Sequence, residues 1–350
     1  MPPATPEPRL STLSHGGGCG CKIAPGVLTE ILKGTTALPV PPQLLVGIET
    51  SDDAAVWQLN DEQALVATTD FFMPIVDDPV DFGRIAATNA ISDVYAMGGR
   101  PILALALVGM PVNVLSTATI GKILEGGASV CRAAGIPVAG GHTIDSVEPI
   151  YGLVALGLVH PKLVKRNADA RPGDVLVLGK PLGVGVMSAA LKKQALGDAG
   201  YARMIDTTTR LNTPGPELAA LPGVHAMTDV TGFGLAGHLH EICRGSKLHA
   251  EISFDALPIL RAARHLAEAG YATGASERNW TSVGPHLSLP ADLAPWKKKM
   301  LTDPQTSGGL LVSCDRAVAA QVLDIFKRQG FKYACEIGSL SAGSSTITVS

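Results

Sequence analysis

A glycine-rich segment near the N-terminus places two cysteines and a lysine side by side. Residues 15–22 read His-Gly-Gly-Gly-Cys-Gly-Cys-Lys, so Cys19, Cys21 and Lys22 lie within one short stretch. Glycines let a backbone approach a ligand closely, and their amides can converge on an anion. The thiolate is the reactive form of cysteine, and an adjacent lysine favours it. The segment is therefore a reactive loop, half of a soft-metal site, or an ordinary surface turn.

Several aspartates follow apolar runs or lie within a helical pattern. They are Asp52, Asp53, Asp70, Asp93 and Asp229. A single aspartate after a strand commonly caps a turn. Several that converge would instead suit Mg²⁺, which prefers oxygen ligands and is held by a few carboxylates together with substrate phosphates. A nucleoside triphosphate also needs its charge neutralised for phosphoryl transfer. Composition alone leaves turn capping and a magnesium–nucleotide site both open.

Three further glycine-rich segments follow apolar runs. They are residues 140–143 (GGHT), 231–234 (TGFG) and 306–309 (TSGG). Backbone amides in such segments can hold phosphates. We expect His142 to follow the end of a strand and to contact phosphate. The Cys19 to Lys22 segment differs from a Walker-type phosphate loop, because that motif has glycine directly before the lysine.

The elements that must position these residues mix strands and helices without strict alternation, which predicts an α+β fold. The predicted strands are 44–47, 64–69, 102–109, 136–139, 150–159, 174–178, 224–228, 248–254, 310–314 and 332–338. The predicted helices include 82–97, 116–134, 233–243 and 316–328. Asn89 and Asp93 are four residues apart in the first of these helices, so they share one of its faces. Residues 1–14 are predicted to be disordered.

Length and composition restrict the class of protein. The chain has 350 residues, which predicts two domains, and the polar stretch 161–172 is the expected boundary between them. The net charge of −3 gives no basic footprint for nucleic acid. No apolar segment reaches the ~20 residues of a membrane span, and the N-terminus lacks the apolar core of a signal peptide. We therefore expect a cytoplasmic protein without direct nucleic-acid or membrane contacts.

Taken together, the motifs resemble those of one family. They are residues 14–23 (SHGGGCGCKI), 52–56 (DDAAV), 68–77 (TTDFFMPIVD), 81–93 (DFGRIAATNAISD), 139–142 (AGGH), 227–234 (MTDVTGFG) and 303–309 (DPQTSGG). This set resembles the selenophosphate synthetases, or selenide, water dikinases, over nearly the whole chain from residue 10. The resemblance implies that ATP, selenide and water give selenophosphate, AMP and orthophosphate. The product would supply activated selenium for selenocysteine and for selenium-modified tRNA.

The resemblance also implies roles for individual residues. Cys19 and Lys22 match the catalytic cysteine and lysine. The implied magnesium ligands are Asp53, Asp70, Asp93 and Asp229. The implied nucleotide contacts are Lys22, Thr50, Ser51, Asp52, Asp70, Asp93, Gly141, His142 and Thr143, of which the last three come from the partner subunit of a homodimer. Ser51 stands where many relatives carry a basic residue.

Family members share the fold of the aminoimidazole ribonucleotide synthetases. The resemblance therefore implies two α+β domains, N-terminal sheets that pair across a homodimer, and a mobile glycine-rich N-terminal loop. We expect residues 1–48 to form a flexible segment with the catalytic loop, residues 49–160 an ATP- and magnesium-binding dimerisation domain, and residues 161–350 the C-terminal domain. The implied partners are ATP, selenide, a second copy of the chain and a selenium-delivery protein.

Two other functions remain as alternatives. One is a different ATP-using enzyme of the same superfamily, such as a small-molecule kinase or a cyclo-ligase, for which the Cys19 to Lys22 loop has no known use. The other is a carrier that binds selenium or a soft metal on Cys19 and Cys21 without turnover, for which the aspartates have no use. Consumption of ATP separates the carrier from both enzymes, and selenide dependence separates the two enzymes.

Overall fold

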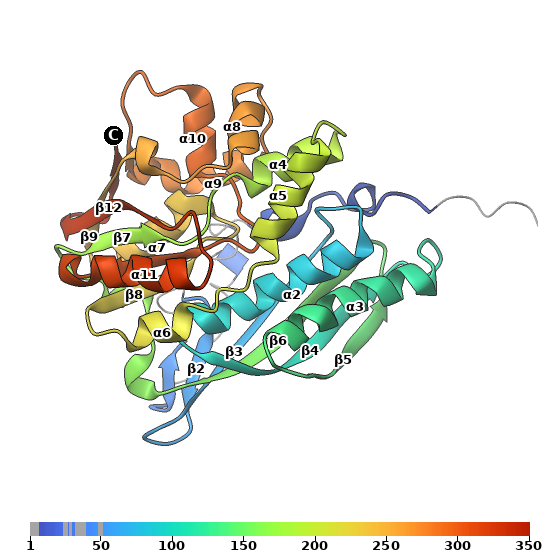
Figure 1. Cartoon of the computed structure of the whole chain (residues 1–350), viewed down its shortest axis with the longest axis horizontal. Helices are drawn as coiled ribbons and strands as arrows, with labels where there is room; N and C mark the ends of the chain where they lie inside the picture. The colour runs from blue at the N-terminus through green and yellow to red at the C-terminus, as the bar shows by residue number, and fades with distance from the viewer. Residues whose placement is uncertain (1–6, 24–26, 28–29, 32–39, 48–51) are drawn as a thin grey trace, which may run out of the picture.

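The chain forms two β-sheets, one from each half of the sequence (Figure 1). The computed structural model describes residues 7–23, 27, 30–31, 40–47 and 52–350. The first sheet has six strands in the order β1-β2-β3-β6-β4-β5, and all neighbours are antiparallel except β4 and β5. Its strands are β1 (Leu44–Val46), β2 (Ala55–Gln58), β3 (Ala64–Phe72), β4 (Arg100–Met110), β5 (Val138–Asp145) and β6 (Ile150–Val159).

Two long helices, α2 (Pro79–Ala96) and α3 (Thr117–Ala133), cover one face of this sheet (Figure 1). Both begin at a side-chain cap, since Asp78 accepts a hydrogen bond from the Asp81 amide and Ser116 accepts one from the Thr119 amide. Strand β3 alternates between buried and more exposed residues. That alternation turns Thr68 and Asp70 toward α2, where they meet polar side chains of the helix.

The second sheet has seven strands in the order β10-β13-β9-β12-β7-β11-β8. They are β7 (Val175–Leu178), β8 (Val224–Asp229), β9 (Leu248–Ile252), β10 (Leu287–Ser288), β11 (Leu310–Cys314), β12 (Cys335–Ala342) and β13 (Ile347–Val349). The helices of this half are α4 (Val184–Lys192), α5 (Asp198–Thr208), α6 (Gly215–Ala220), α7 (Gly234–Ser246), α8 (Arg261–Glu268), α9 (Gly274–Val283), α10 (Pro295–Leu301) and α11 (Ala319–Arg328). Within the described ranges, every helix is too short or too polar to cross a bilayer.

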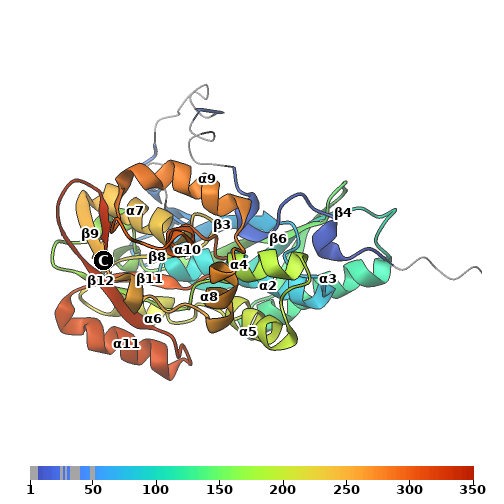
Figure 2. The same ribbon diagram turned by 90° about the horizontal axis from the view of Figure 1, so that it is seen from above.

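Helix α2 joins the two halves. It packs on β3 and β6 of the first sheet and also contacts β8, α5 and α6 of the second half (Figures 1 and 2). It has 18 residues, and 13 of them are buried. Polar side chains on its buried face, such as those of Asn89 and Ser92, are therefore enclosed within the molecule.

Two expectations from the sequence are wrong in detail. Residues 7–14 are ordered, because Leu10 is buried and Arg9 forms an ion pair with Asp77, with 2.7 Å between Nε and Oδ2. The strand predicted for 136–139 runs on through residues 140–143, which lie inside β5 rather than in a loop after it. Gly141 has a φ of +155°, and a Cβ there would lie 2.0 Å from the Ala106 carbonyl oxygen. Its glycine therefore allows close pairing of β5 with β4.

The contact between α2 and α3 gives a test of the packing. A Cβ on Gly83 would lie 1.9 Å from the Ile123 carbonyl oxygen, whereas a Cβ on Gly121 of α3 would meet no atom within 4 Å. We expect Gly83→Ala to lower the free energy of unfolding by about 1–3 kcal/mol through overpacking. The control Gly121→Ala should raise it by roughly 0.5–1 kcal/mol, since alanine suits a helix better. Urea unfolding measures both, and equal effects of the two substitutions would contradict this packing.

Candidate active site

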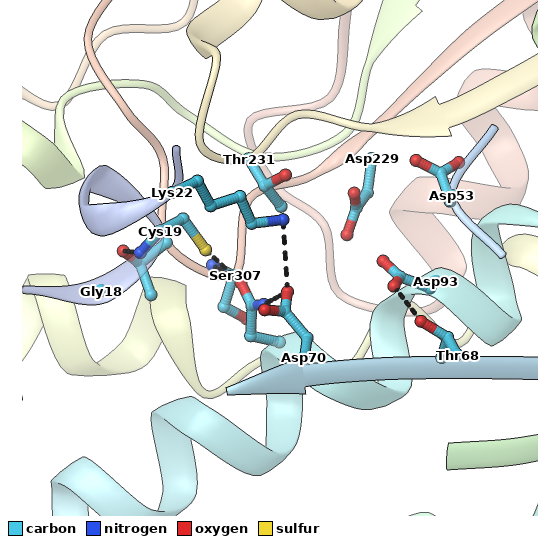
Figure 3. Close-up of polar contacts among 12 residues, drawn as sticks. Gly18, Cys19, Lys22, Asp53, Thr68, Asp70, Asp93, Asp229, Thr231 and Ser307 are labelled. Carbon is cyan, nitrogen blue, oxygen red and sulfur yellow. Dashed lines mark hydrogen bonds and ion pairs between the residues drawn. The ribbon is translucent and has the colours of Figure 1, made fainter. Parts of the chain in front are cut away.

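Three carboxylates from separate elements meet between the two sheets (Figure 3). Asp53 precedes β2, Asp93 lies on α2, and Asp229 ends β8. One oxygen from each lies within 4.8 Å of the others. The Thr228 hydroxyl donates to Asp53 Oδ1 at 2.8 Å, and the Thr68 hydroxyl donates to Asp93 Oδ2 at 2.5 Å. These contacts fix the side chains but leave other carboxylate oxygens available.

Burial and the charge of a neighbouring carboxylate raise the pKa of all three carboxyl groups. For Asp53 and Asp93 burial contributes most, followed by the charge of Asp229. For Asp229 burial again dominates, the charge of Asp70 adds to it, and Ser92 opposes it. Both effects disfavour the charged form. The charged cluster therefore requires positive charge nearby.

The cluster suits a divalent cation. Asp53 Oδ2 and Asp229 Oδ2 are buried atoms without a hydrogen-bond partner. Buried polar atoms are nearly always paired, so two unpaired carboxylate oxygens in one cluster point to a ligand. Carboxylate oxygens alone form the ligand set, which matches Mg²⁺ rather than a soft metal.

The glycine-rich loop packs beside this cluster (Figure 3). Residues Gly18–Cys21 form one turn of 3₁₀-helix, in which Cys19 is 1% exposed. The Cys19 amide donates to Thr306 Oγ1 at 3.2 Å, and the Cys19 thiol donates to Asn89 Oδ1 at 3.1 Å. Gly18 has a φ of +54°, and a Cβ there would lie 2.2 Å from Thr306 Oγ1. Only glycine allows this close approach.

The charges around Cys19 favour the neutral thiol. Burial and the charge of Asp70 raise its pKa well above the ordinary value, and Lys22 opposes them only in part. Lys22 Nζ lies 3.6 Å from Asp70 Oδ2, and the lysine side chain is 41% exposed while that of Asp70 is 8% exposed. Asp70 is the main cause that raises the pKa of Lys22. The loop therefore presents a thiol and an ammonium group.

Asn89 connects the loop to the sheet. Its Nδ2 donates to Asp70 Oδ2, while its Oδ1 accepts from the Cys19 thiol and, at 2.6 Å, from the Ser307 amide. The sequence placed Asn89 and Asp93 on one helical face, and the structure confirms this. The sequence did not indicate that Asn89 contacts Cys19, because the contact joins residues 70 positions apart. Nor did it indicate that the Thr68 and Thr228 hydroxyls donate to carboxylates of the cluster.

Of the remaining nucleotide-contact candidates, Asp52 lies close enough for its charge to raise the pKa of Asp53, whereas the others lie apart from the cluster or outside the described residues. Asp52 accepts a hydrogen bond from the Asn167 amide at 2.6 Å. Gly141, His142 and Thr143 are exposed on β5, which lies three strands away from β3 in the sheet. Thr50 and Ser51 fall outside the described residues.

A cavity of about 780 Å³ opens beside the loop. Cys21 and Lys22 line it, together with Lys192, Lys193 and Arg278. Arg278 also donates to the Gly20 carbonyl oxygen at 2.8 Å. The described residues that line this cavity include no carboxylate. A small anion that approaches the loop from this side therefore meets positive charge.

Two matching domains and their fold define the class of protein. Residues 51–159 match the family model for the AIR synthase related protein, N-terminal domain, and residues 171–350 match that for the C-terminal domain. The fold resembles thiamine-monophosphate kinase from Stenotrophomonas maltophilia K279a, with a TM-score of 0.66 over 94% of this chain and 96% of that one at 21% identity. It also resembles hydrogenase maturation protein HypE in complex with ATP, with a TM-score of 0.63 over 92% and 90% of the two chains at 20% identity. The chain is thus a two-domain AIR synthase-related protein.

Closer relatives define the particular family. The chain is 66% identical to selenide, water dikinase of Burkholderia ambifaria over 99% of this chain and 98% of the relative. It is 65% identical to that of Pseudomonas straminea over 98% and 96%, and 57% identical to that of Rhizobium meliloti over 99% of both. The chain belongs to the selenide, water dikinase family.

Removal of one carboxylate tests the cluster. Because the pKa of Asp229 is raised in the folded protein, its charge destabilises the fold at neutral pH. This destabilisation is relieved as the pH falls toward the ordinary pKa of an aspartate, because the folded state then takes up a proton. We expect Asp229→Asn to raise the melting temperature in metal-free buffer at pH 7.5 by about 2 °C or more. Added Mg²⁺ should stabilise the unaltered protein but not the variant.

The control is Asp255→Asn, which changes a carboxylate that is 88% exposed. It should leave both the melting temperature and the response to Mg²⁺ unchanged. A normal Mg²⁺ response in Asp229→Asn would refute the assignment of this cluster as a cation site.

Proposed function

We propose that this chain is a selenide, water dikinase that converts ATP, selenide and water into selenophosphate, AMP and orthophosphate. Relatives of that name match it at 57–66% identity over nearly their full length. Selenophosphate would then serve as the activated selenium for selenocysteine and for selenium-modified tRNA. The observation that carries the proposal is the buried carboxylate cluster beside the loop with Cys19 and Lys22.

In this proposal the carboxylates would hold Mg²⁺ for the nucleotide substrate. Asp53, Asp93 and Asp229 would hold the ion together with Asp70, which also pairs with Lys22. When bound, Mg²⁺ neutralises phosphate charge and supports phosphoryl transfer by positioning and electrostatic stabilisation. The nucleotide would also contact Thr50, Ser51 and Asp52 at the start of the first domain.

Lys22 is proposed to stabilise the transferring phosphoryl group. Its raised pKa keeps the amine protonated, and its partner Asp70 holds it at the end of β3 beside the carboxylates. The loop would also exclude water from the γ-phosphate until selenide attacks. A loop that must admit substrates has to leave its docked position, so mobility of residues 15–22 belongs to the proposal.

Cys19 has two proposed uses. Its neutral, buried thiol holds the loop against Asn89 at rest. Selenium chemistry at this sulfur would need the thiolate, so it would follow a rearrangement that separates Cys19 from Asp70. Cys21 lies in the same loop and donates to the Gly18 carbonyl oxygen at 2.7 Å, a local contact that does not reach the carboxylates.

Three parts of the chain have separate proposed roles. Residues 1–48 supply the loop, residues 49–160 bind ATP and Mg²⁺ and form the dimer contact, and residues 161–350 close the site with β8 and the turn at 303–309. Selenide would reach the loop either free or from a selenium-delivery protein, and its approach past Lys192, Lys193 and Arg278 fits its negative charge.

A second copy of the chain is proposed to complete the nucleotide site. Strand β5 is exposed along its whole length and ends the sheet, and the surface there carries Val138 and Ile144, which are 38% and 56% exposed. Such an edge invites pairing with another chain. Pairing would bring Gly141, His142 and Thr143 of one subunit to the nucleotide of the other.

Charge placed on this surface tests the dimer. We expect sedimentation to give twice the chain mass of 36.1 kDa. Ile144→Asp should yield folded monomer with at least tenfold lower turnover, since the edge would then bury a charge. Tyr333→Asp, at a 39% exposed position in the other half, should stay dimeric and active. A monomeric parent protein with full activity would refute the shared site.

The reaction itself is tested by separating AMP from ADP chromatographically after anaerobic incubation with ATP and Mg²⁺. We expect AMP and orthophosphate only when selenide is present. ADP formed without selenide would assign another superfamily kinase instead. If folded protein consumed no ATP, the carrier function would be favoured, and ATP use that appeared only with a selenium-delivery protein would identify that partner as required.

The same assay tests the loop. Cys19→Ala should lower selenide-dependent AMP formation by at least 100-fold, because it removes both the thiol and its contact with Asn89. Cys21→Ala is the matched control and should stay within about threefold of the parent protein. Full activity in Cys19→Ala would exclude an essential role for that side chain.

A further inference from the structure

A lysine outside the proposed catalytic set is almost completely buried behind the site. Lys180 follows β7 and is 2% exposed. Its Nζ donates to the Ser307 carbonyl oxygen at 2.8 Å. Burial lowers the pKa of Lys180 to about 7, and the charge of Asp229 opposes that effect. Lysine is rarely buried so fully, and its burial here indicates a specific role for this side chain.

The partner of Lys180 is a residue in an unusual backbone conformation. Ser307 has a φ of +53°, which costs free energy for any residue with a Cβ. Its amide donates to Asn89 Oδ1 at 2.6 Å, and the neighbouring Thr306 hydroxyl accepts from the Cys19 amide. The turn that Lys180 holds therefore contacts the loop directly through Thr306 and indirectly through Asn89, whose side chain accepts from the Cys19 thiol. Ser307 and Cys19 are both labelled in Figure 3.

The same turn also reaches the carboxylate cluster. The Gly308 carbonyl oxygen accepts from Asn212 Nδ2 at 2.9 Å, and the same nitrogen donates to Ser92 Oγ at 2.7 Å. Ser92 lies beside the cluster, since it lowers the pKa of Asp229. A shift of this turn would therefore move groups that hold both the loop and the cluster.

Space around the turn leaves little room for another arrangement. A Cβ on Gly309 would lie 2.2 Å from the Lys180 amide nitrogen, and one on Gly308 would lie 1.8 Å from the Val230 carbonyl oxygen. The backbone at 308–309 is thus pressed against residues just after β7 and β8. The Ser307 carbonyl oxygen has an amine as its partner there, and an apolar side chain would leave it unpaired in a buried place.

We infer that Lys180 is a positioning residue that fixes the Thr306–Ser307 turn and, through it, the docked position of Cys19 and Asn89. The contacts run from the Lys180 amine to the Ser307 carbonyl, from the Ser307 amide to Asn89, and from Asn89 to the Cys19 thiol. The inference concerns the geometry of the loop. Only its consequence for turnover rests on the proposed function.

The test compares the alkylation rates of three cysteines in one protein. Cys19, Cys243 and Cys314 are 1%, 0% and 0% exposed, so each reacts only when its surroundings open. Lys180→Met should raise the rate at Cys19 by at least tenfold, measured by iodoacetamide labelling and peptide mass spectrometry. The rates at Cys243 and Cys314 should stay within about twofold of the parent protein.

Lys165→Met is the matched control. Lys165 is a partly buried lysine whose Nζ donates to the Val224 carbonyl oxygen at 2.6 Å. Lys165→Met therefore removes the same kind of contact at a place away from the turn. The alkylation rate at Cys19 should not change. In the AMP assay Lys180→Met should lower kcat at least tenfold, with the KM for ATP within threefold, because the loop rather than the whole nucleotide site is displaced.

Two results would overturn the inference. An unchanged Cys19 rate in Lys180→Met would show that the loop does not depend on this lysine. A parallel rise at Cys19, Cys243 and Cys314 would show that Lys180 only supports the C-terminal half as a whole. The labelling test requires no turnover, so it stays decisive even if the chain proves to catalyse a different reaction.

Discussion

Three carboxylates buried at one point form the constraint on which the rest of the structure depends. One oxygen from each of Asp53, Asp93 and Asp229 lies within 4.8 Å of the others. Burial raises the pKa of each, and the charge of Asp229 further raises the pKa of Asp53 and Asp93. Charges of one sign at such distances repel by several kcal/mol at the effective dielectric constant of a partly buried site. Without a bound cation, this repulsion would only destabilise the fold. The cluster is therefore best explained as the binding site of a cation.

The architecture serves this cluster by bringing separate parts of the chain to it. Helix α2 contributes Asp93 and Asn89 and packs against both sheets. Strand β8 ends at Asp229, and the turn at 303–309 supports the docked loop. Because the carboxylates come from both halves of the molecule, any change in how the halves pack would alter the spacing of the ligands. Catalysis by positioning depends on such spacing.

Much of the fold followed from local patterns in the sequence. Strands β6 (150–159) and β11 (310–314) and the cap at Ser116 match their predictions, since apolar runs and capping residues act locally. The predicted strand 136–139 ends before β5 does, because Gly140 and Gly141 are typical of a turn when the close approach of β4 is unknown. Order in residues 7–14 was missed for a similar reason, as Arg9 is held by a partner 68 residues away.

The sequence supplied the candidate site residues mainly through the resemblance of their motifs, and the structure adds what joins them. No spacing rule relates Cys19 to Asn89, or Lys180 to Ser307, because these contacts cross 70 and 127 residues. Thr68 precedes Asp70 by two positions yet donates to Asp93, since alternation on β3 turns both toward α2. Contacts of this kind depend on packing between elements.

The most direct test of the account is phosphorus NMR under anaerobic conditions, with ATP, Mg²⁺ and selenide enriched in ⁷⁷Se. The account predicts a new phosphorus resonance split by coupling to selenium, together with equal amounts of AMP and orthophosphate. The signal should be absent in folded Asp53→Asn, whose cluster lacks one ligand. Loss of ATP without any selenium-coupled resonance would contradict the central claim that this site joins selenium to phosphorus.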